Sequence, residues 1–297
     1  MVRRGELTDK AWQRIEPLLP ATDGRGRPWR NHREVINGIL WRLRTGAPWR
    51  DVPERYGPWQ TCYERFARWD ADGTWARLLE EMQVKDDSVG TVELTVSIDS
   101  TIARAHQHAA GARKRGTTAG RSNTKQSQKR QALGRSRGGL TTKLHLITES
   151  RGLPLTLHLT GGNVVDCTAF EAVMAGLRLR RRIGRPRTRP DRLVGDKGYS
   201  SRKIRLYLRQ RGIRAVIPER RDQIANRKRK GRLGGRPPAF DSTVYKGRNL
   251  VERCFGKLKQ WRAVATRFDK LASRYLAGAV IASLMLWLRH AELSDTA

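Results

Sequence analysis

Two acidic residues follow short apolar segments in a way that could build an active site. Asp99 comes after an alternating segment (TVSI), and the alternation predicts a strand that ends at this acid. Asp196 comes after a second short apolar segment (RLVG), with Gly195 and Gly198 beside it to permit close backbone approach. We therefore expect both carboxylates where strands give way to loops at the surface.

A third acid, Glu252, lies in the segment YKGRNLVERCFGKLKQWR, whose apolar residues recur at helical spacing. Arg248, Glu252 and Lys259 share a second face of this predicted helix, and Tyr245 continues that face if the helix begins early enough. A carboxylate between Arg and Lys could meet a metal ion and a phosphate backbone together. An exposed helix with surface ion pairs fits the same spacing. The apolar stripe consists of Val251, Cys254, Phe255, Leu258 and Trp261.

The types of these side chains bear on the choice of cofactor. Three carboxylates with no Cys or His set nearby in the sequence favour Mg²⁺ or Mn²⁺ over zinc. Two such ions, about 4 Å apart in sites of this type, could activate a water or a DNA 3′-hydroxyl and stabilise the leaving 3′-oxygen. The chain contains no G-x-x-x-x-G-K-[ST] loop, so we predict no nucleotide cofactor.

The elements that must position the acids indicate an α/β fold. Period-two alternation predicts strands at 94–98, 143–148 and 153–159, a short strand before Asp196, and another at 214–217. Helices are predicted at about 167–179 and 201–211. Strands followed by alternating helices and strands are typical of a mixed-sheet domain, which we place at residues 91–297.

The N-terminal part, residues 1–85, has helical periodicity and predicts a small all-helical domain. Thr8 is a candidate N-cap for a first helix, and Gly46 ends a second. A third apolar stripe, in which Tyr63 takes part, runs from Trp59 to Trp69.

The opposite face of this third helix carries Gln60, Arg65 and Arg68, which could reach bases or phosphates if the helix lay in a major groove of DNA. This is a helix-turn-helix-like hypothesis for a DNA-binding domain. A solvated polar face explains the same residues equally well. The connection between Gly46 and Trp59 is also longer than the tight turn of the strict motif.

Composition narrows the class of partner. Sixty-one Lys and Arg against 28 Asp and Glu leave a formal charge of +33, so the surface requires an anionic partner such as nucleic acid. An anionic membrane is the alternative partner. The apolar stretch from Leu276 to Leu288 is too short to span a bilayer, however, and predicts a core helix. We see no signal peptide and predict a cytoplasmic protein. Three widely spaced cysteines indicate neither disulfides nor zinc.

Three strongly basic stretches interrupt the predicted elements, at residues 106–139, 178–192 and 220–238. Each lacks the apolar content to fold alone, so we expect mobile basic loops. Gly-Arg-Pro triplets at 26–28, 184–186 and 235–237 are similar to minor-groove hooks, although solvated loops fit them as well.

Four sequence blocks in order resemble the DDE transposases of bacterial insertion sequences, specifically the "insertion sequence five" group with its Y-R-E-K signature. The N-terminal run from LTDKAW through GILWRLRTGAPWRDVPERYGPWQT resembles that group's DNA-binding region. VSIDSTIARAHQHAAGARK and GDKGY resemble its first and second acid motifs. Tyr245, Arg248, Glu252 and Lys259 have the signature's spacing of two, three and six intervening residues, and ATRFDKLA follows.

This resemblance implies an RNase-H-like catalytic domain, with Asp99, Asp196 and Glu252 as catalytic residues and metal ligands. It implies binding of the element ends, then metal-dependent cleavage and strand transfer through a 3′-hydroxyl, by at least a homodimer on double-stranded DNA. It also implies a bacterial, nucleoid-associated location. Many relatives have Asp where this chain has Ser200. The residues expected to contact DNA are Tyr245, Arg248, Lys259, Lys197, Gln60, Arg65 and Arg68.

Two other classes of function remain open from the sequence. A DNA-coating or repressor-like protein fits the composition and the helical N-terminus, but it does not require acids at strand ends and on a basic helix. A nuclease for RNA strands or DNA junctions fits the acids but not the N-terminal resemblance.

Overall fold

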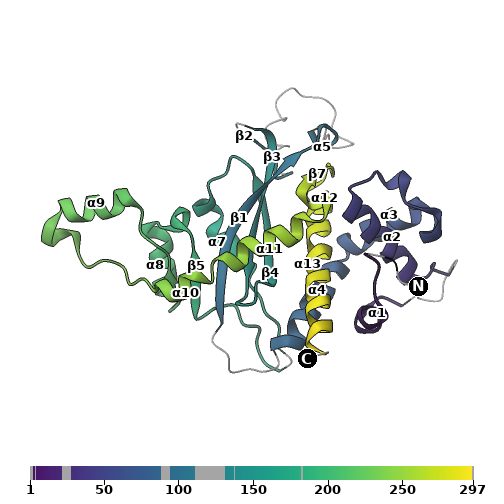
Figure 1. The fold of residues 1–297 in the computed structure, drawn as a ribbon, viewed down its shortest axis with the longest axis horizontal. Helices are drawn as coiled ribbons and strands as arrows, with labels where there is room; N and C mark the ends of the chain where they lie inside the picture. Colours follow the sequence, from purple (N-terminus) through teal and green to yellow (C-terminus); the bar gives the residue numbers. More distant parts are fainter. Residues whose placement is uncertain are drawn as a thin grey trace.

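The computed structural model describes residues 3, 5–21, 28–87, 94–110, 131–136, 138–181 and 183–295. A helical N-terminal region precedes a mixed sheet with helices packed around it (Figure 1). This is the α/β fold class expected from the sequence.

The N-terminal region contains α1 (Asp9–Ile15), α2 (His32–Thr45), α3 (Trp59–Ala71) and α4 (Thr74–Asp87). The Thr8 side chain accepts a hydrogen bond from the Ala11 backbone N–H, which confirms the predicted N-cap. α2 ends at Gly46, whose φ of 71° is the left-handed conformation that glycine adopts without strain. The link from α2 to α3 contains two 3₁₀ turns, Trp49–Asp51 and Glu54–Tyr56, so it is not a tight turn.

The strands are β1 (Thr95–Ala105), β2 (Gly134–Ser136), β3 (Gly139–Thr148), β4 (Pro154–Gly161), β5 (Arg192–Gly195), β6 (Arg214–Val216) and β7 (Thr266–Arg267). Their order is β2-β3-β1-β5-β6, with β4 also paired to β3 and β7 to β1. β3 runs antiparallel to β1 and β4, whereas β5 and β6 run parallel to β1. This is the mixed, RNase-H-like sheet that the resemblance implies.

One predicted boundary in this sheet is wrong. Asp99 does not end β1, because the strand continues to Ala105. The cause is long-range pairing: β3 accompanies β1 as far as Arg104, and β7 joins it at Arg104 and Ala105. The partner on the other side, β5, does end just before the acid, so one edge of β1 is unpaired at Asp99.

Two helices cover opposite faces of the sheet near this point. Successive side chains of a strand alternate between faces. Asp99 contacts Arg248 at the start of α11 (Asn249–Lys259), whereas Ser100 contacts Asp166 at the start of α7 (Asp166–Ala175). α11 therefore lies on one face of β1 and α7 on the other.

The C-terminal helix α13 (Ala272–Ser294) joins the N-terminal helices to the sheet. It contacts α4, β4 and α11, and one continuous hydrophobic core includes residues of all of them (Figure 1). Among the described residues, α13 alone is long and apolar enough to cross a membrane by length and composition. Since 61% of its most apolar window is buried inside the protein, it has the character of a core helix. The short α12 (Arg262–Ala265) precedes it.

The basic stretches are more ordered than expected where the structure describes them. Residues 220–238 are not a plain loop, because they contain α9 (Arg221–Arg229) and a 3₁₀ turn at Gly231–Gly234. Residues 178–192 contain a bridge between Leu179 and Arg187. Of residues 106–139, α5 (Gln107–Ala110) and β2 are formed, while 111–130 and 137 lie outside the described residues. α8 (Arg202–Gln210) packs beside β6, and α10 (Ser242–Lys246) precedes α11.

Candidate active site

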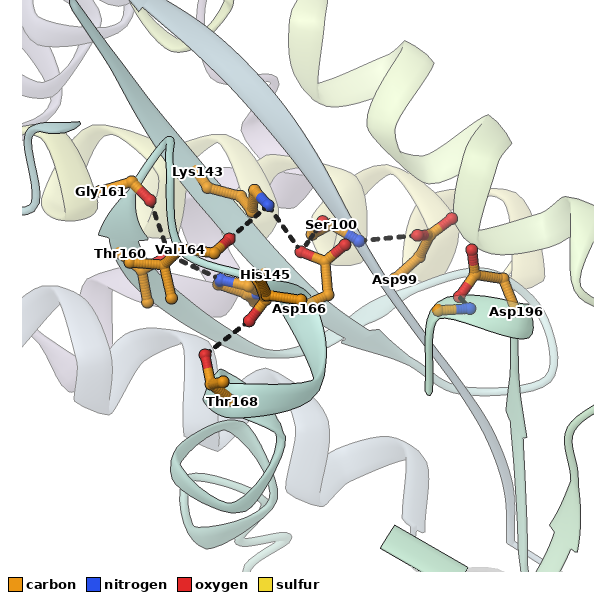
Figure 2. Close-up of polar contacts among 12 residues, drawn as sticks. Asp99, Ser100, Lys143, His145, Thr160, Gly161, Val164, Asp166, Thr168 and Asp196 are labelled. Carbon is orange, nitrogen blue, oxygen red and sulfur yellow. Dashed lines mark hydrogen bonds and ion pairs between the residues drawn. The ribbon is translucent and has the colours of Figure 1, made fainter. Parts of the chain in front are cut away.

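The first two predicted acids lie beside each other at the point where β5 ends. β1 and β5 pair in parallel up to Ile98 and Gly195, and Asp99 and Asp196 are the next residues on the two chains. Figure 2 shows their carboxyl groups adjacent to one another. The backbone register therefore brings together two acids that are 97 positions apart in the chain.

The loop after β5 holds Asp196 in a defined orientation. Its carboxylate accepts the backbone N–H of Gly198 at 2.8 Å and caps the 3₁₀ turn Lys197–Tyr199. A Cβ at position 198 would lie 2.9 Å from the Asp196 Oδ1, closer than real Cβ contacts allow. Glycine at position 198 therefore leaves room for the Asp196 carboxylate against the backbone, and a larger residue there would shift that carboxylate.

The third acid reaches the first through a shared arginine. Arg248 donates from Nη2 to Asp99 Oδ2 and from Nη1 to Glu252 Oε1, each at 2.9 Å. α11 presents these groups because its other face packs into the core, where the predicted stripe of Val251, Cys254, Phe255, Leu258 and Trp261 is buried. A Cβ at Gly256 would meet nothing within 4 Å, so the surface beyond Glu252 is open.

Tyr245 does not continue the helix of Glu252. α11 begins at Asn249, and Tyr245 lies on α10 with its ring 5.2 Å from that of Phe240. It is still close enough to Arg248 to influence the guanidinium. Lys259, in the last turn of α11, and Lys197, in the turn after Asp196, are both exposed.

Burial and neighbouring charge shift the titration of this cluster. The pKa of Asp99 is raised, mainly because the carboxyl is buried. The Ser100 N–H and Arg248 oppose this by lowering the pKa, whereas the nearby Asp196 and Glu252 raise it further. Burial alone would lower the pKa of Arg248, but the attraction of Asp99 and Glu252 outweighs it and the pKa of the guanidinium is raised. Arg248 is therefore the counter-charge that the acids have in this conformation.

The oxygen-only donors of Asp99, Asp196 and Glu252 fit a hard divalent cation. Within the described residues, however, no three His, Cys, Asp or Glu side chains stand ready to hold a metal. Instead, the Arg248 guanidinium lies between Asp99 and Glu252 and forms an ion pair with each. The residues fit a metal ion if Arg248 moves aside.

A fourth acid, Asp166, lies on the α7 face of the sheet against Ser100, the residue that follows Asp99, and sequence reasoning missed it. Its carboxylate accepts from Ser100 Oγ at 2.8 Å and pairs with Lys143 Nζ at 2.9 Å (Figure 2). Lys143 also donates to the Val164 carbonyl at 2.6 Å. The signal was present: Lys143 and His145 alternate with apolar residues in KLHLIT, so one face of that strand had to be polar.

The N-terminal residues expected to contact DNA do not all share one exposed face. Gln60 and Arg68 are exposed on α3, but Arg65 is only 6% exposed, so its predicted position on that face is wrong. Its guanidinium lies 4.2 Å from the centroid of Trp29 and 5.3 Å from that of Trp69, and it contacts the His32 ring.

Tyr63, assigned to the apolar stripe of α3, is 38% exposed instead. α3 and α9 lie toward opposite ends of the molecule's long axis (Figure 1).

Two family models match this chain, and both describe transposases. The family model "Transposase DDE domain" matches residues 90–287, and the model "Putative transposase of IS4/5 family" matches residues 7–79. The chain belongs to the transposase DDE domain family, and it is an enzyme of DNA transposition.

Of three similar proteins, two are named as transposases of insertion sequences. The chain is 41% identical over 109 residues to the uncharacterized protein y4sN of Sinorhizobium fredii, which covers 36% of this chain and 83% of that protein. It is 27% identical over 150 residues to the putative transposase for insertion sequence element IS6501 of Brucella ovis, covering 50% and 100%. It is 32% identical over 159 residues to the putative transposase for IS402 of Burkholderia cepacia, covering 52% and 67%.

Among solved structures, a pre-cleavage Mos1 transpososome aligns over 92% of this chain and 85% of that chain, with 12% identity and a TM-score of 0.26. A likeness this distant carries no weight for function.

Proposed function

We propose that this chain binds the ends of an insertion sequence and catalyses metal-dependent DNA cleavage and strand transfer through a 3′-hydroxyl. The observation that supports this most is the proximity of the three acids. The pairing of β1 with β5 places Asp99 beside Asp196, and Arg248 bridges Asp99 and Glu252. A protein that only coats DNA has no need of two carboxylates on one arginine with a third carboxylate beside them.

Asp99, Asp196 and Glu252 would hold Mg²⁺ or Mn²⁺, with two ions per site. When bound, such ions activate the attacking oxygen and stabilise the leaving 3′-oxygen. Arg248 then transfers its paired donors from the two acids to a phosphate near the scissile bond, since a guanidinium suits carboxylate and phosphate geometry alike. Lys197 and Lys259 hold flanking phosphates, and Tyr245 stacks on a displaced base or donates to a phosphate.

We assign catalysis to residues 91–297 and binding of the element ends to residues 1–85. Gln60 and Arg68, on the exposed face of α3, contact the end DNA. Arg65, which is buried, supports that face from behind through Trp29. We expect at least a dimer on DNA, so that two ends are held together, within the bacterial cytoplasm.

The test is cleavage of a labelled duplex that carries the element's own end, with Mg²⁺ or Mn²⁺ present. Glu252→Ala is compared with the unaltered chain and with Glu171→Ala. The control is well matched, because the Glu252 and Glu171 side chains are 52% and 51% exposed and each pairs with a basic residue. DNA binding is measured on all three proteins.

We expect nicks with a 3′-hydroxyl from the unaltered chain and Glu171→Ala, loss of nicking by at least about a hundredfold in Glu252→Ala, and binding by all three. Joining of the freed end to target DNA would complete the assignment. Binding without cleavage in the unaltered chain would instead favour a DNA-binding protein.

A further inference from the structure

The segment 218–240, called here the arm, extends away from the core. All of its residues are described and none is buried. Figure 1 shows α9, the helix of the arm, at one end of the molecule's long axis, beyond α8 and α10. A segment that buries no side chain receives little stabilisation from the hydrophobic core. The conformation of the arm therefore depends on its local contacts.

Those local contacts lead to the loop of the second acid. Arg220 donates from Nε to the Lys197 carbonyl at 2.9 Å and from Nη2 to the Gly198 carbonyl at 3.1 Å. Gln223 donates to the Ser200 carbonyl at 2.5 Å and accepts from the Ser200 hydroxyl at 2.8 Å. The base of the arm is thus bonded to the residues that follow Asp196, and Ser200 is one of its attachment points.

The arm is strongly basic and should therefore attract an anionic partner. It has eight Lys and Arg against two acids, and one of these acids, Glu219, is already paired with Arg227 at 2.7 Å. The remaining basic side chains on α9 and its tip are exposed. Their number and spread along a projecting element match a phosphate backbone rather than a single anion.

The tip adds an apolar group. Leu233 is 92% exposed in the 3₁₀ turn after α9, between Arg232 and Arg236. The flanking Gly231 and Gly235 have φ of 52° and 71°, conformations that allow the chain to turn sharply at the tip. Proteins that enter DNA grooves combine Arg with an apolar wedge that separates base steps.

We propose that the arm binds duplex DNA beside the catalytic acids, with Arg232 and Arg236 on phosphates and Leu233 inserted between base pairs. This inference rests on the proposed function and adds to it a means of holding and deforming the DNA at Asp196. Because the arm is bonded to residues 197–200, DNA seated on it has a set position relative to the second acid.

The first experiment measures affinity of the full chain for a fluorescent duplex without divalent metal, over a series of NaCl concentrations. Arg232→Ala/Arg236→Ala is compared with Arg178→Ala/Arg209→Ala, which removes the same charge from exposed positions outside the arm. We expect the arm variant to bind more weakly and its slope of log affinity against log salt to fall by about 2, one for each lost phosphate contact. The control variant should keep the original slope. Equal losses in the two variants would overturn the proposal.

The second experiment tests the wedge with 2-aminopurine placed in turn at positions along the duplex. Unstacking by Leu233 should raise the emission at one position on binding, and Leu233→Ala should return it to the level of the free duplex with the salt slope unchanged. Leu206→Ala, on α8 and 49% exposed in the unaltered chain, is the matched control and should keep the increase. If the emission of 2-aminopurine still increased with Leu233→Ala, insertion of Leu233 between base pairs would be ruled out.

The two proposals fail in distinguishable ways. If the unaltered chain binds no duplex, the proposed function itself is wrong. If it binds and nicks DNA while the arm variants behave as their controls, only the arm inference is wrong. Neither variant changes a residue of the core or of the acid cluster, so folding should be unaffected.

Discussion

At the scale of single residues, Arg248 is the group that decides the state of the candidate site. It forms ion pairs with Asp99 and Glu252, and its side chain is only 22% exposed. In the conformation described, the guanidinium satisfies the same carboxylates that a divalent cation would need. If the proposed roles hold, we expect binding of DNA and binding of metal to be linked, because a phosphate that attracts Arg248 would also free the two acids.

This linkage predicts that Arg248→Ala binds Mn²⁺ more tightly than the unaltered chain in the absence of DNA. Loss of a competing positive charge beside two carboxylates should raise the affinity by about tenfold, the effect of roughly 1.4 kcal/mol. Cleavage should fall in the same variant, since the phosphate contact is lost. Calorimetric titration with Mn²⁺ measures the first effect, and Arg253→Ala, an exposed arginine on the same helix, is the control. Weaker Mn²⁺ binding would mean that Arg248 is needed to hold the acids in place.

At the scale of elements, α3 depends on a cation buried among aromatic rings. The Arg65 guanidinium contacts the Trp29, Trp69 and His32 rings, and it is nearly excluded from water. This arrangement fixes the segment before α2 against α3. The exposed stripe of Gln60 and Arg68 is therefore supported by a residue that sequence periodicity placed on the same face.

We expect Arg65→Ala to lower the free energy of unfolding by about 2 kcal/mol, the value of a desolvated cation–π contact. Arg68→Ala should lower it by no more than about 0.5–1 kcal/mol, because the Arg68 guanidinium lies 5.4 Å from the Trp29 centroid but is exposed to solvent. Urea denaturation of both variants measures the difference. Similar losses would show that Arg65 is not the support of this helix.

The sheet contains a buried histidine that should make stability depend on pH. His145 on β3 is fully buried, its Nε2 lies 2.8 Å from Thr160 Oγ1, and burial lowers its pKa to about 4, against a smaller opposing effect of Asp166. In the folded protein the ring stays neutral, whereas the unfolded chain takes up a proton near pH 6.5. The contribution of this group to stability is present above pH 6.5 and is lost as the pH falls toward 4.

Up to about 3 kcal/mol of unfolding free energy should be lost over that range through His145. His145→Gln keeps a polar group within reach of the Thr160 hydroxyl but does not titrate, so the stability of this variant should fall less between pH 7 and pH 4.5. His108→Gln, at an exposed position, should fall as much as the unaltered chain. Denaturant unfolding at the two pH values provides the comparison, and an undiminished fall in His145→Gln would refute the assignment.

At the scale of the whole molecule, a charge of +33 on 297 residues opposes folding through self-repulsion. The N-terminal helices, α11 and α13 share one core with the sheet, so the repulsion is resisted by a single continuous apolar interior. DNA relieves it by binding, and salt relieves it by screening.

We therefore expect the melting temperature of the free protein to rise between about 0.1 M and 1 M NaCl, where the screening length falls from about 10 Å to about 3 Å. Added duplex DNA should raise it at the low salt concentration and have little effect at the high one, because binding to phosphates weakens with salt. Scanning calorimetry or fluorimetry measures both. A melting temperature that falls with salt would show that ion pairs, rather than repulsion, dominate the surface.

Much of the architecture could be predicted from the sequence because it follows local rules. Apolar spacing of 3.6 residues identified the buried face of α11, a threonine capped α1 and a glycine ended α2. Alternation located the central strands, and the placement of Asp99 and Asp196 after apolar segments was enough to nominate them. These features are determined within a few residues of each other along the chain.

Only the tertiary structure decided which groups meet. The length of β1 beyond Asp99 depends on β3 and β7, which are distant in sequence. The contact of Asp166 with Ser100 crosses 66 positions, and that of Arg248 with Asp99 crosses 149. Burial of Arg65 likewise requires Trp29 and His32 from outside its helix. Sequence patterns report which face of an element is apolar, but the partner of each polar group is fixed by how the elements pack.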